Sequence, residues 1–527
     1  MSASRHFPHG AVASPHHLAS AAGRSVLVEG GNAVDAAIAA NLVLAVVTPY
    51  LCGTGGDLLA LVHDDAPHGL TSTGRAPAGA TTEAIRAAID AGHGDPARSF
   101  PGTDGMPMLG ALPVTVPGAV AGWFHLLERW GTRSFGHLAT PAVRLAAEGF
   151  EVSEHAAGHV ERARARLDTQ PNWNANYGRM HARARFVQAD LAATLRRLAD
   201  DGPDALYRGS IGERIVETLQ ANGSTMTAED LAGHTVDDVG TISGRFRDVE
   251  VLELPPPTQG VTALTALGVV DALGPPAADP AVALHRQIEA VRAAMADRGQ
   301  YLGDPDLMDI EVAQLLDAER IQGIAAAIDD TAAGPWPTVR SAPGGTAYLC
   351  AADGDGLLVS LIQSNFAGFG SGVVVPGTGV GLHNRGAHFR VEPGHVSSIG
   401  PRRRPVHTLI PALALRDGEP WLVFGTMGGD GQPQIHLQVL AGMLDRGLEV
   451  QAAIDAPRFL VDVGDGSVAV ESRVAPELLS ALADRGHRVT TMDAYDHRAG
   501  HAHAIARTTA GYVGGSDPRS EGAIVGH

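Results

Sequence analysis

The chain is poor in the residues that restrict location and partners most strongly. It has only two cysteines among 527 residues, and none of its cysteines has zinc-site spacing. A disulfide framework is therefore excluded, and a reducing compartment is expected. Lys and Arg number 39 against 58 Asp and Glu, a net charge of −19, so neither nucleic acid nor an anionic membrane surface is expected as a partner. The one short basic cluster, residues 401–405, is either a solvated turn or an anion contact.

Long apolar runs are also lacking. The longest, residues 36–47, contains Asn41 and is too short to span a bilayer. The first ten residues have no apolar segment of the kind found in secretory signals. These observations predict a cytoplasmic protein.

Histidine is plentiful, with 24 residues, but no HExxH metalloprotease motif occurs. His155 and His159 could share a helix face, yet the acidic residues beside them are typical of a solvated surface. Three further histidines lie in a glycine-punctuated stretch near the C-terminus. We predict surface or packing roles for these histidines, and we expect neither a metal nor a cofactor.

The residues that are present describe a large mixed α/β protein. Hydrophobic residues make up 44% of the chain, enough for a sizeable core. Length alone suggests three or four domains, although one layered domain can absorb it. Helices are predicted over 14–29, 33–47, 120–130, 140–148, 190–200, 211–222, 281–301, 435–444, 450–455 and 476–485. Strands are predicted at 58–63 and within 239–254, and at 348–352, 357–363, 408–415, 420–425 and 466–471.

Thr346 stands after two glycines at the head of a predicted β-hairpin. Cleavage of the Gly345–Thr346 bond would make this threonine an N-terminus. Its hydroxyl would then be a nucleophile and its freed α-amine a base. The pattern alone leaves both interpretations open, because Gly-Gly-Thr before a strand is more often a plain turn. Residues 329–341, with several Gly and Pro, predict a mobile segment ahead of the bond.

A series of motifs then resembles the γ-glutamyltransferase family of N-terminal-nucleophile hydrolases. The first is Gly-Gly-Asn-Ala-Val-Asp-Ala-Ala at residues 30–37, and the series runs in order over roughly residues 12–520. Thr346 falls where that family has its nucleophile, seven residues before Asp353. The other motifs are Val-Pro-Gly-Ala-Val-Ala-Gly-Trp at 116–123, Glu-Ala at 289–290, Ala-Asp-Arg at 296–298, Gly-Phe-Gly-Ser-Gly at 368–372, Met-Gly-Gly at 427–429, Asp-Ala-Pro-Arg at 455–458 and Ser-Asp-Pro-Arg at 516–519.

The resemblance implies a four-layer αββα sandwich and a proenzyme that cuts itself before Thr346. Residues 1–345 would form a large subunit and residues 346–527 a small one, intertwined as one structural domain. Whether such heterodimers associate further stays open.

The resemblance also implies roles for individual residues. The α-amine of Thr346 has a reference pKa of about 7.7–8.0, so it can act as a base near neutral pH. The backbone N–H groups of Gly428 and Gly429 match the family's oxyanion hole. Ser364 matches a hydroxyl that supports the nucleophile and self-cleavage; the alternative is a serine that only ends a strand.

On the substrate side the chain departs from the γ-glutamyl pattern. The family's carboxylate-binding arginine is replaced by Arg75, two residues later and without the adjoining Glu. His388 stands where the family has an acid for the substrate amine, and a histidine cannot replace that anion. Arg385 lies in the same stretch, and His407 and Thr408 replace a paired serine. These residues suggest an anionic substrate without a free α-amine, unless Arg385 pairs with a structural acid.

Two specific activities follow. The family's commonest activity predicts a hydrolase or transferase of γ-glutamyl compounds such as glutathione. The lost acid favours an amidohydrolase of a small anionic amide such as oxamate, and another acylase activity, such as that on cephalosporins, stays open. An uncleaved scaffold protein is the alternative from a different class.

Overall fold

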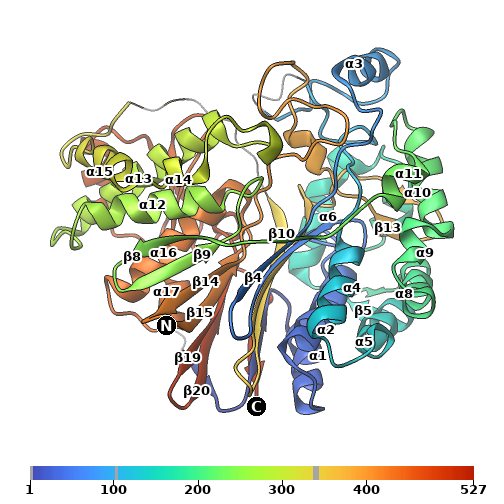
Figure 1. Cartoon of the computed structure of the whole chain (residues 1–527), viewed down its shortest axis with the longest axis horizontal. Coiled ribbons are helices and arrows are strands. Elements are labelled where there is room, and N and C mark those ends of the chain that lie inside the picture. Colours follow the sequence, from blue (N-terminus) through green and yellow to red (C-terminus); the bar gives the residue numbers. More distant parts are fainter. Residues whose placement is uncertain (1–3, 101–104, 336, 338–343) are drawn as a thin grey trace.

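Two antiparallel seven-stranded sheets form the centre of the molecule (Figure 1). The computed structural model describes residues 4–100, 105–335, 337 and 344–527. The first sheet has the order β21 (Ala523–Gly526), β2 (Ala11–Ser14), β10 (Gly345–Ala352), β11 (Leu358–Phe366), β3 (Asp57–His63), β4 (Pro67–Ser72) and β7 (Asp237–Val239). The second has the order β1 (Arg5–Phe7), β20 (Gly511–Ser516), β19 (Ala502–Thr508), β15 (Glu419–Thr426), β14 (Ala412–Arg416), β9 (Val249–Glu253) and β8 (Ile242–Phe246).

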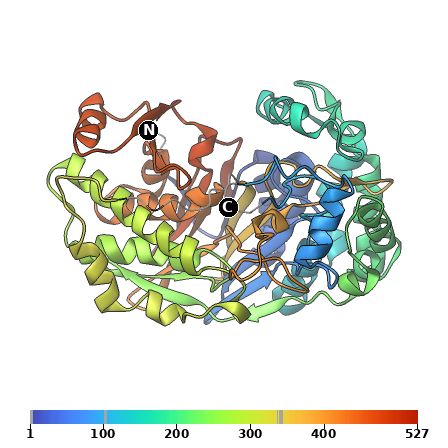
Figure 2. The same cartoon turned by 90° about the horizontal axis from the view of Figure 1, so that it is seen from above.

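The sheets pack face to face, and helices cover their outer faces (Figures 1 and 2). Between them, Tyr348 and Ile362 of the first sheet share a buried cluster with Val423 and Ile505 of the second. The first sheet is covered by α1 (His17–Val28), α2 (Ala33–Val47), α4 (Ala119–Trp130) and α5 (Phe135–Glu148). The second is covered by α12 (Gly260–Ala272), α13 (Pro280–Tyr301), α16 (Gln432–Leu444) and α17 (Val450–Asp455). The mixed α/β class is confirmed, and the layers run helix, sheet, sheet, helix.

The remaining helices and strands surround these layers. The helices are α3 (Thr82–Asp90), α6 (Glu154–Leu167), α7 (Trp173–Tyr177), α8 (Ala189–Asp201), α9 (Asp204–Tyr207), α10 (Ser210–Gln220), α11 (Ala228–Ala232), α14 (Val312–Leu315), α15 (Ala318–Ala326) and α18 (Pro476–Asp484). The strands are β5 (Phe150–Glu151), β6 (Arg185–Phe186), β12 (Val374–Val375), β13 (Val380–Gly381), β16 (Phe459–Val461), β17 (Val468–Glu471) and β18 (Val489–Met492).

The N-terminus of α2 is tied to the hairpin that begins at Thr346. Asn32 and Asp35 form a capping box at this end of the helix. The backbone N–H of Ala33 donates to the carboxylate of Asp353, in the turn between β10 and β11, at 2.8 Å. A carboxylate at a helix N-terminus is stabilised by the helix dipole and by the free N–H groups. Asp353 therefore fixes the far end of the hairpin to a helix that is buried along its whole length.

Both sheets contain strands from either side of the Gly345–Thr346 bond. In the first, β10 and β11 lie between β2 and β3, which come early in the chain. In the second, β9 from before the bond pairs with β14 from after it. Cutting the bond would therefore leave the two pieces joined by continuous hydrogen-bonded sheets.

The first part of the segment before the bond is held by specific contacts. The guanidinium of Arg286 donates two hydrogen bonds of 2.7 Å to Asp330, and the backbone N–H of Gly334 donates to Glu289. These contacts hold residues 329–334 against α13, because the acids and bases of this helix face them. The remainder of the predicted mobile segment, residue 336 and residues 338–341, lies outside the described residues.

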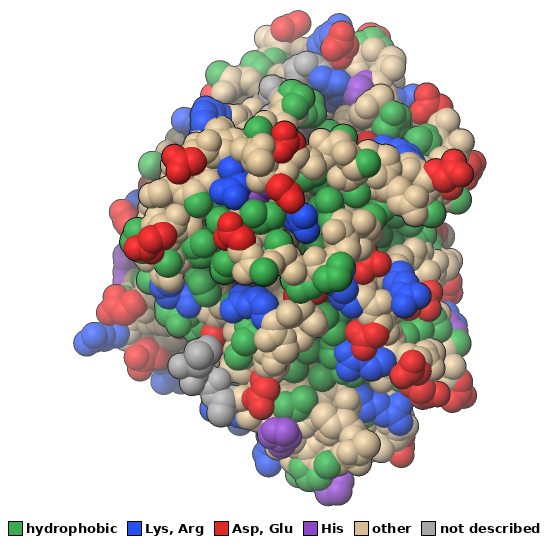
Figure 3. All heavy atoms as spheres, turned by 90° about the vertical axis from the view of Figure 1, so that its left-hand side faces the viewer, with side chains coloured by type: hydrophobic (Ala, Val, Ile, Leu, Met, Phe, Trp, Pro, Cys, Tyr) green, Lys and Arg blue, Asp and Glu red, His purple; other side chains and the backbone are tan. Residues whose placement is uncertain are grey.

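The surface carries charges of both signs, and both cysteines are buried. On the face seen in Figure 3, acidic and basic side chains are interspersed. Cys52 and Cys350 are buried free thiols. Across the described ranges, no helix has both the length and the apolarity needed to cross a bilayer. In the basic cluster, Arg404 pairs with Asp237 and Arg403 donates to a backbone carbonyl, as in a structural turn.

Candidate active site

Thr346 on β10 and Ser364 on β11 face each other across the hairpin that these two strands form. Their hydroxyl oxygens lie 3.0 Å apart, and Thr346 is 1% exposed. The Ser364 hydroxyl also donates to the carbonyl oxygen of Gly345 at 2.7 Å. Since a hydroxyl has one hydrogen, Ser364 must accept the hydrogen of Thr346. Ser364 therefore contacts both the Gly345 carbonyl and the Thr346 hydroxyl, the two groups that a residue supporting self-cleavage would polarise and orient.

The strand pairing is irregular at this bond. Gly345 pairs with Phe366 and Thr346 with Ser364, so Asn365 is passed over, as in a β-bulge. Phe366 has φ of 75°, a left-handed conformation that bulky residues rarely adopt. Its N–H donates to the Ser364 hydroxyl at 2.8 Å. Bulges and left-handed residues of this kind concentrate at functional sites, where they aim a side chain.

Gly428 and Gly429 lie directly against the backbone that leads to the bond. A β-carbon on Gly344 would stand 2.3 Å from the nitrogen of Gly429, so only glycine fits there. Gly428 itself has φ of 142°, in the region that favours glycine. Both N–H groups are at the start of the 3-10 turn Gly429–Gly431, where helical N–H groups lack a partner within the turn. This arrangement suits donors to a developing oxyanion.

Gln259 connects this turn to the neighbouring loop, a role that sequence analysis missed. Its side-chain N–H₂ donates to the carbonyls of Gly429 at 2.8 Å and Thr408 at 2.9 Å. Its side-chain oxygen accepts from Arg298, which forms an ion pair with Asp430. The Ala-Asp-Arg motif at 296–298 was a signal for Arg298, but nothing local marks Gln259, because its partners come from distant parts of the chain.

We expect the substitution Gln259→Ala to lower kcat by about 10- to 100-fold with little change in KM. Loss of both hydrogen bonds would let the Gly429 turn shift, and small misplacements near reacting atoms cost about this much. Steady-state kinetics of the mature protein measure it. Gln220→Ala is the matched control, because Gln220 also donates to a backbone carbonyl, that of Met226, on a different helix. Equal losses in the two variants would contradict a positioning role for Gln259.

Arg385 is a buried cation next to this group. Its guanidinium lies 4.0 Å from the ring centre of Phe366, and its Nη1 donates to the Thr408 hydroxyl at 3.0 Å. Its Nε and Nη2 have no hydrogen-bond partner among the described residues. Among the described residues, no carboxylate lies within ion-pair distance of this guanidinium. The predicted alternative, in which Arg385 pairs with a structural acid, is therefore not observed.

Burial lowers the pKa of Arg385 to about 9, with Asp57 and Asp430 opposing the shift. The side chain therefore stays charged at neutral pH. Two unpaired donors on a buried cation are unusual in a folded protein, because such groups are costly to leave unsatisfied. They are typical of a place where an anion binds.

His407 is held by Asp57, another residue that sequence analysis missed. The Nε2 of His407 lies 3.0 Å from the Asp57 carboxylate, and His383 lies 3.6 Å from it. Burial, followed by the charge of Arg385, lowers the pKa of His407 to about 4. Burial opposes ionisation of Asp57, but the two histidines and Arg385 outweigh it and lower its pKa to about 2. A neutral His407 that donates to Asp57 keeps a lone pair on Nδ1, a buried acceptor beside Arg385.

The other two predicted binding residues differ from each other. His388 packs edge-on against Phe366, with ring centres 4.5 Å apart, and its Nδ1 lies 2.9 Å from the carbonyl of Val406. It therefore lies beside Arg385. The guanidinium of Arg75 instead donates to the carbonyl of Arg402 at 3.0 Å in a surface turn. Among the described residues, no hydrogen bond or ion pair joins the Arg75 side chain to Arg385, His407 or Thr408.

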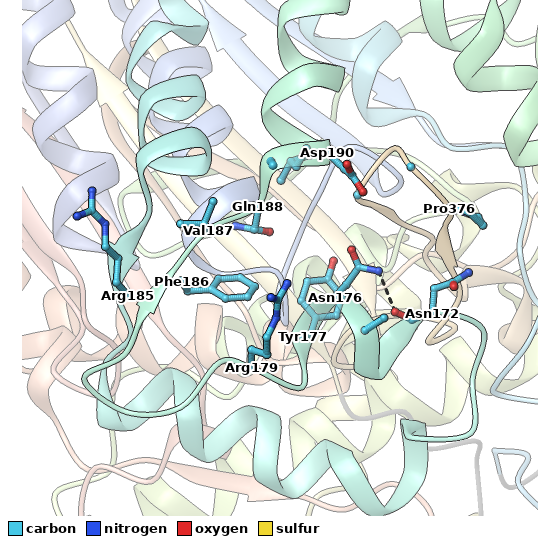
Figure 4. Close-up of a pocket in the computed structure, with 15 residues that line it drawn as sticks. Asn172, Asn176, Tyr177, Arg179, Arg185, Phe186, Val187, Gln188, Asp190 and Pro376 are labelled. Atoms are coloured by element: carbon cyan, nitrogen blue, oxygen red, sulfur yellow. Dashed lines mark hydrogen bonds between the residues drawn. The ribbon is translucent and has the colours of Figure 1, made fainter.

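Cavity size alone would not find this site. A cavity of about 680 Å³ lies between α7, α8 and residues 376–379 (Figure 4). None of the predicted site residues lines it. A smaller cavity of about 190 Å³ opens on Gly344 and Gly345. The position of the chemistry therefore follows from the nucleophile and the buried cation.

The comparison with protein families agrees with this geometry. The model described as Gamma-glutamyltranspeptidase matches residues 19–527. The chain belongs to this family. As expected of a member, it has mixed α/β architecture, and like its relatives named as proenzymes it is an amide-bond hydrolase.

Individual relatives cover almost the whole chain. It is 36% identical to an oxamate amidohydrolase proenzyme of Klebsiella pneumoniae subsp. pneumoniae, over 98% of both chains. It is 35% identical to the glutathione hydrolase-like YwrD proenzyme of Bacillus subtilis, also over 98% of both. Among solved structures, cephalosporin acylase from Bacillus halodurans superposes with a TM-score of 0.92 at 36% identity, covering 100% of this chain and 97% of that one. These relatives are named for three different substrates, so similarity does not select one.

Proposed function

We propose that this family member is a self-processing amidohydrolase with Thr346 as its nucleophile. The 3.0 Å contact between the Thr346 and Ser364 hydroxyls and the 2.7 Å bond from Ser364 to the Gly345 carbonyl support this. Relatives named as proenzymes support the maturation step.

In maturation, the Thr346 hydroxyl oxygen attacks the carbonyl carbon of Gly345. The C–N bond breaks, an ester forms on Thr346, and the hydroxyl proton is transferred to the nitrogen, which becomes a free α-amine. Water then hydrolyses the ester, giving the carboxylate of Gly345 and the free threonine hydroxyl. Residues 1–345 and 346–527 stay together, because both sheets contain strands of each.

In the mature protein, the same hydroxyl attacks a substrate amide. The α-amine of Thr346 removes the hydroxyl proton and returns it to the departing amine. The N–H groups of Gly428 and Gly429 stabilise the oxyanion, and one such donor is typically worth about 3 kcal/mol. The product is an acyl group esterified to Thr346, which water or a second amine then removes.

The substrate that fits best is a small amide whose acyl half carries a carboxylate, such as oxamate. The observation that supports this most strongly is Arg385, buried and charged, with Nε and Nη2 unpaired. Arginine holds carboxylates with two parallel hydrogen bonds. Thr408 adds a hydroxyl to the same place.

A γ-glutamyl compound is the second candidate, and it rests on family membership and on the YwrD-like relative. The α-ammonium group of such a compound needs an acidic side chain as its partner. Position 388 instead holds a histidine, whose Nδ1 is hydrogen-bonded to the Val406 carbonyl. An acylase acting on larger amides is supported only by the similarity to cephalosporin acylase.

The experiment compares ammonia release from oxamate with release of p-nitroaniline from γ-glutamyl-p-nitroanilide. We expect kcat/KM for oxamate to be higher by at least about 100-fold, the discrimination of a site built around a charged hydrogen-bond partner. Protein with Thr346→Ala measures the background. Strong p-nitroaniline release without ammonia release would contradict the oxamate-like substrate and leave the γ-glutamyl one.

A further inference from the structure

A second group of cations lies near the Gly345–Thr346 bond. The cavity of about 190 Å³ that opens on Gly344 and Gly345 has an apolar floor of Tyr50, Phe369 and Met427. Arg162 and Arg166, one turn apart on α6, line it as well. We propose that this cavity receives the amine half of the substrate and that this half carries a carboxylate, bound by Arg162. The inference rests on the proposed function and narrows its substrate: the acyl half is that of oxamate, and the leaving amine is an amino acid in place of ammonia.

Two acids lie near this cavity: Glu521 acts electrostatically on Tyr50, and Asp496 lies beside His497. Within the described ranges, neither Arg162 nor Arg166 has an ion pair, although Arg166 donates to the carbonyl of Gly368 at 3.0 Å. Arg164, between them, instead pairs with Glu161 and Asp168. The guanidinium groups of Arg162 and Arg166 thus add positive charge to a cavity of a protein with a net charge of −19.

The histidines around the cavity do not supply its charge. His159 stacks on Tyr50, with ring centres 4.2 Å apart, and meets His497 edge-on at 5.5 Å. Burial, followed by nearby His155 and Arg162, lowers the pKa of His159 to about 2. His497 lies 3.6 Å from Asp496, which also pairs with Arg498. The exposed Arg162 is therefore the group that a ligand carboxylate can reach from the cavity.

The surroundings of Arg385 and of the cavity beside Gly345 indicate which half of the amide each one takes. Arg385 is enclosed, at 1% exposure, which suits an acyl group that stays on the protein as an ester. The cavity beside Gly345 lies next to the exposed Arg162, which suits an amine that must leave before water enters. Its volume is below the range of about 300–1,000 Å³ for drug-sized ligands. An amine of amino-acid size fits it.

A second anion could occupy the same cavity. Maturation would create a carboxylate on Gly345, which lines it. If that carboxylate stays on Arg162, substrates with and without a carboxylate in the amine half would be cleaved alike.

The test uses two amides with the same acyl half. N-oxalylglycine carries a carboxylate in its amine half, and N-oxalylglycinamide is a neutral match of nearly the same size. Oxalate release is measured for both with mature wild-type protein, and the ratio of the two kcat/KM values is the readout. We expect a ratio of at least about 10 in favour of the glycine compound, the value of one charge-assisted hydrogen bond. Arg162→Gln should lower this ratio by about 10-fold.

Arg164→Gln is the matched control, because it removes an equal charge from the same helix at a residue that pairs elsewhere. Its ratio should equal that of the wild type. A wild-type ratio near one, or a ratio that Arg162→Gln leaves unchanged, would overturn the inference. If neither compound releases oxalate, the oxalyl acyl half is wrong. The kcat/KM ratio is then measured with γ-glutamylglycine and γ-glutamylglycinamide, which differ by the same carboxylate. No turnover of either pair would remove both the proposed function and this inference.

Discussion

Protein with Thr346→Ala is expected to remain one uncleaved chain of 54.4 kDa without amidohydrolase activity. Alanine has no hydroxyl to attack the Gly345 carbonyl, so neither the ester nor the free α-amine can form. Turnover should fall by at least about 10,000-fold, as in other enzymes that lose their nucleophile. Gel electrophoresis, N-terminal sequencing and steady-state kinetics measure the three effects.

Thr346→Ser provides the control. Serine keeps the hydroxyl 3.0 Å from Ser364, so the chain should still be cut and a fragment that starts at residue 346 should appear. Cleavage of the Thr346→Ala protein at the same bond would mean that another group attacks it. A wild-type protein that folds and stays uncleaved would favour the scaffold alternative.

The second large effect is expected for Arg385→Gln. This change removes the buried positive charge but keeps a side chain of similar length, so the substrate carboxylate loses its partner. We expect kcat/KM for oxamate to fall by at least about 100-fold, mainly through KM, because hydrogen bonds between charged partners are the strong ones. Self-cleavage should continue, since it involves no substrate carboxylate.

Two further variants separate this effect from general damage. Arg385→Lys keeps the charge but loses the planar pair of donors, so it should recover only part of the activity. Arg75→Gln should change kcat/KM little, because the Arg75 guanidinium binds the Arg402 carbonyl at the surface. An Arg75→Gln protein as impaired as Arg385→Gln would contradict the position of the substrate that the structure supports. Melting temperatures of all three proteins report any loss of folding.

Local patterns predicted much of the fold. The helix at 33–47 is confirmed residue for residue, because the Asn32 cap and Pro49 both mark its ends in the sequence. The hairpin after Thr346 is confirmed for the same reason, with a Gly/Asp turn between two apolar runs. The helix Gly260–Ala272 was missed, since it is apolar on nearly all sides and shows no period. Strand β19 was missed because His503 within it and His501 just before it are buried, although histidine is not typical of a core strand.

The site was predicted less evenly. Ser364 was predicted from its match to a family position, and it lies in the same hairpin as Thr346, 18 residues away. Asp57 and Gln259 were missed, since their partners lie 350 and up to 170 residues away in sequence. Arg75 stands two residues after the family's arginine, and its side chain donates to the Arg402 carbonyl in a neighbouring loop. A position in a motif indicates where the backbone passes and does not determine where a long side chain points.

The sequence by itself determined the family and predicted the nucleophile and the bond to be cut, because all three depend on residues that are consecutive or in a set order. It also showed that the acid for a substrate amine is missing, since His388 occupies that position. Only the tertiary structure decided that Arg385 is a buried cation with free donors, that Arg75 donates to the Arg402 carbonyl, and that Arg162 and Arg166 line a cavity with Gly344 and Gly345. Those properties depend on burial and on which distant side chains come within hydrogen-bonding distance, and the chain acquires both only when the two sheets pack together.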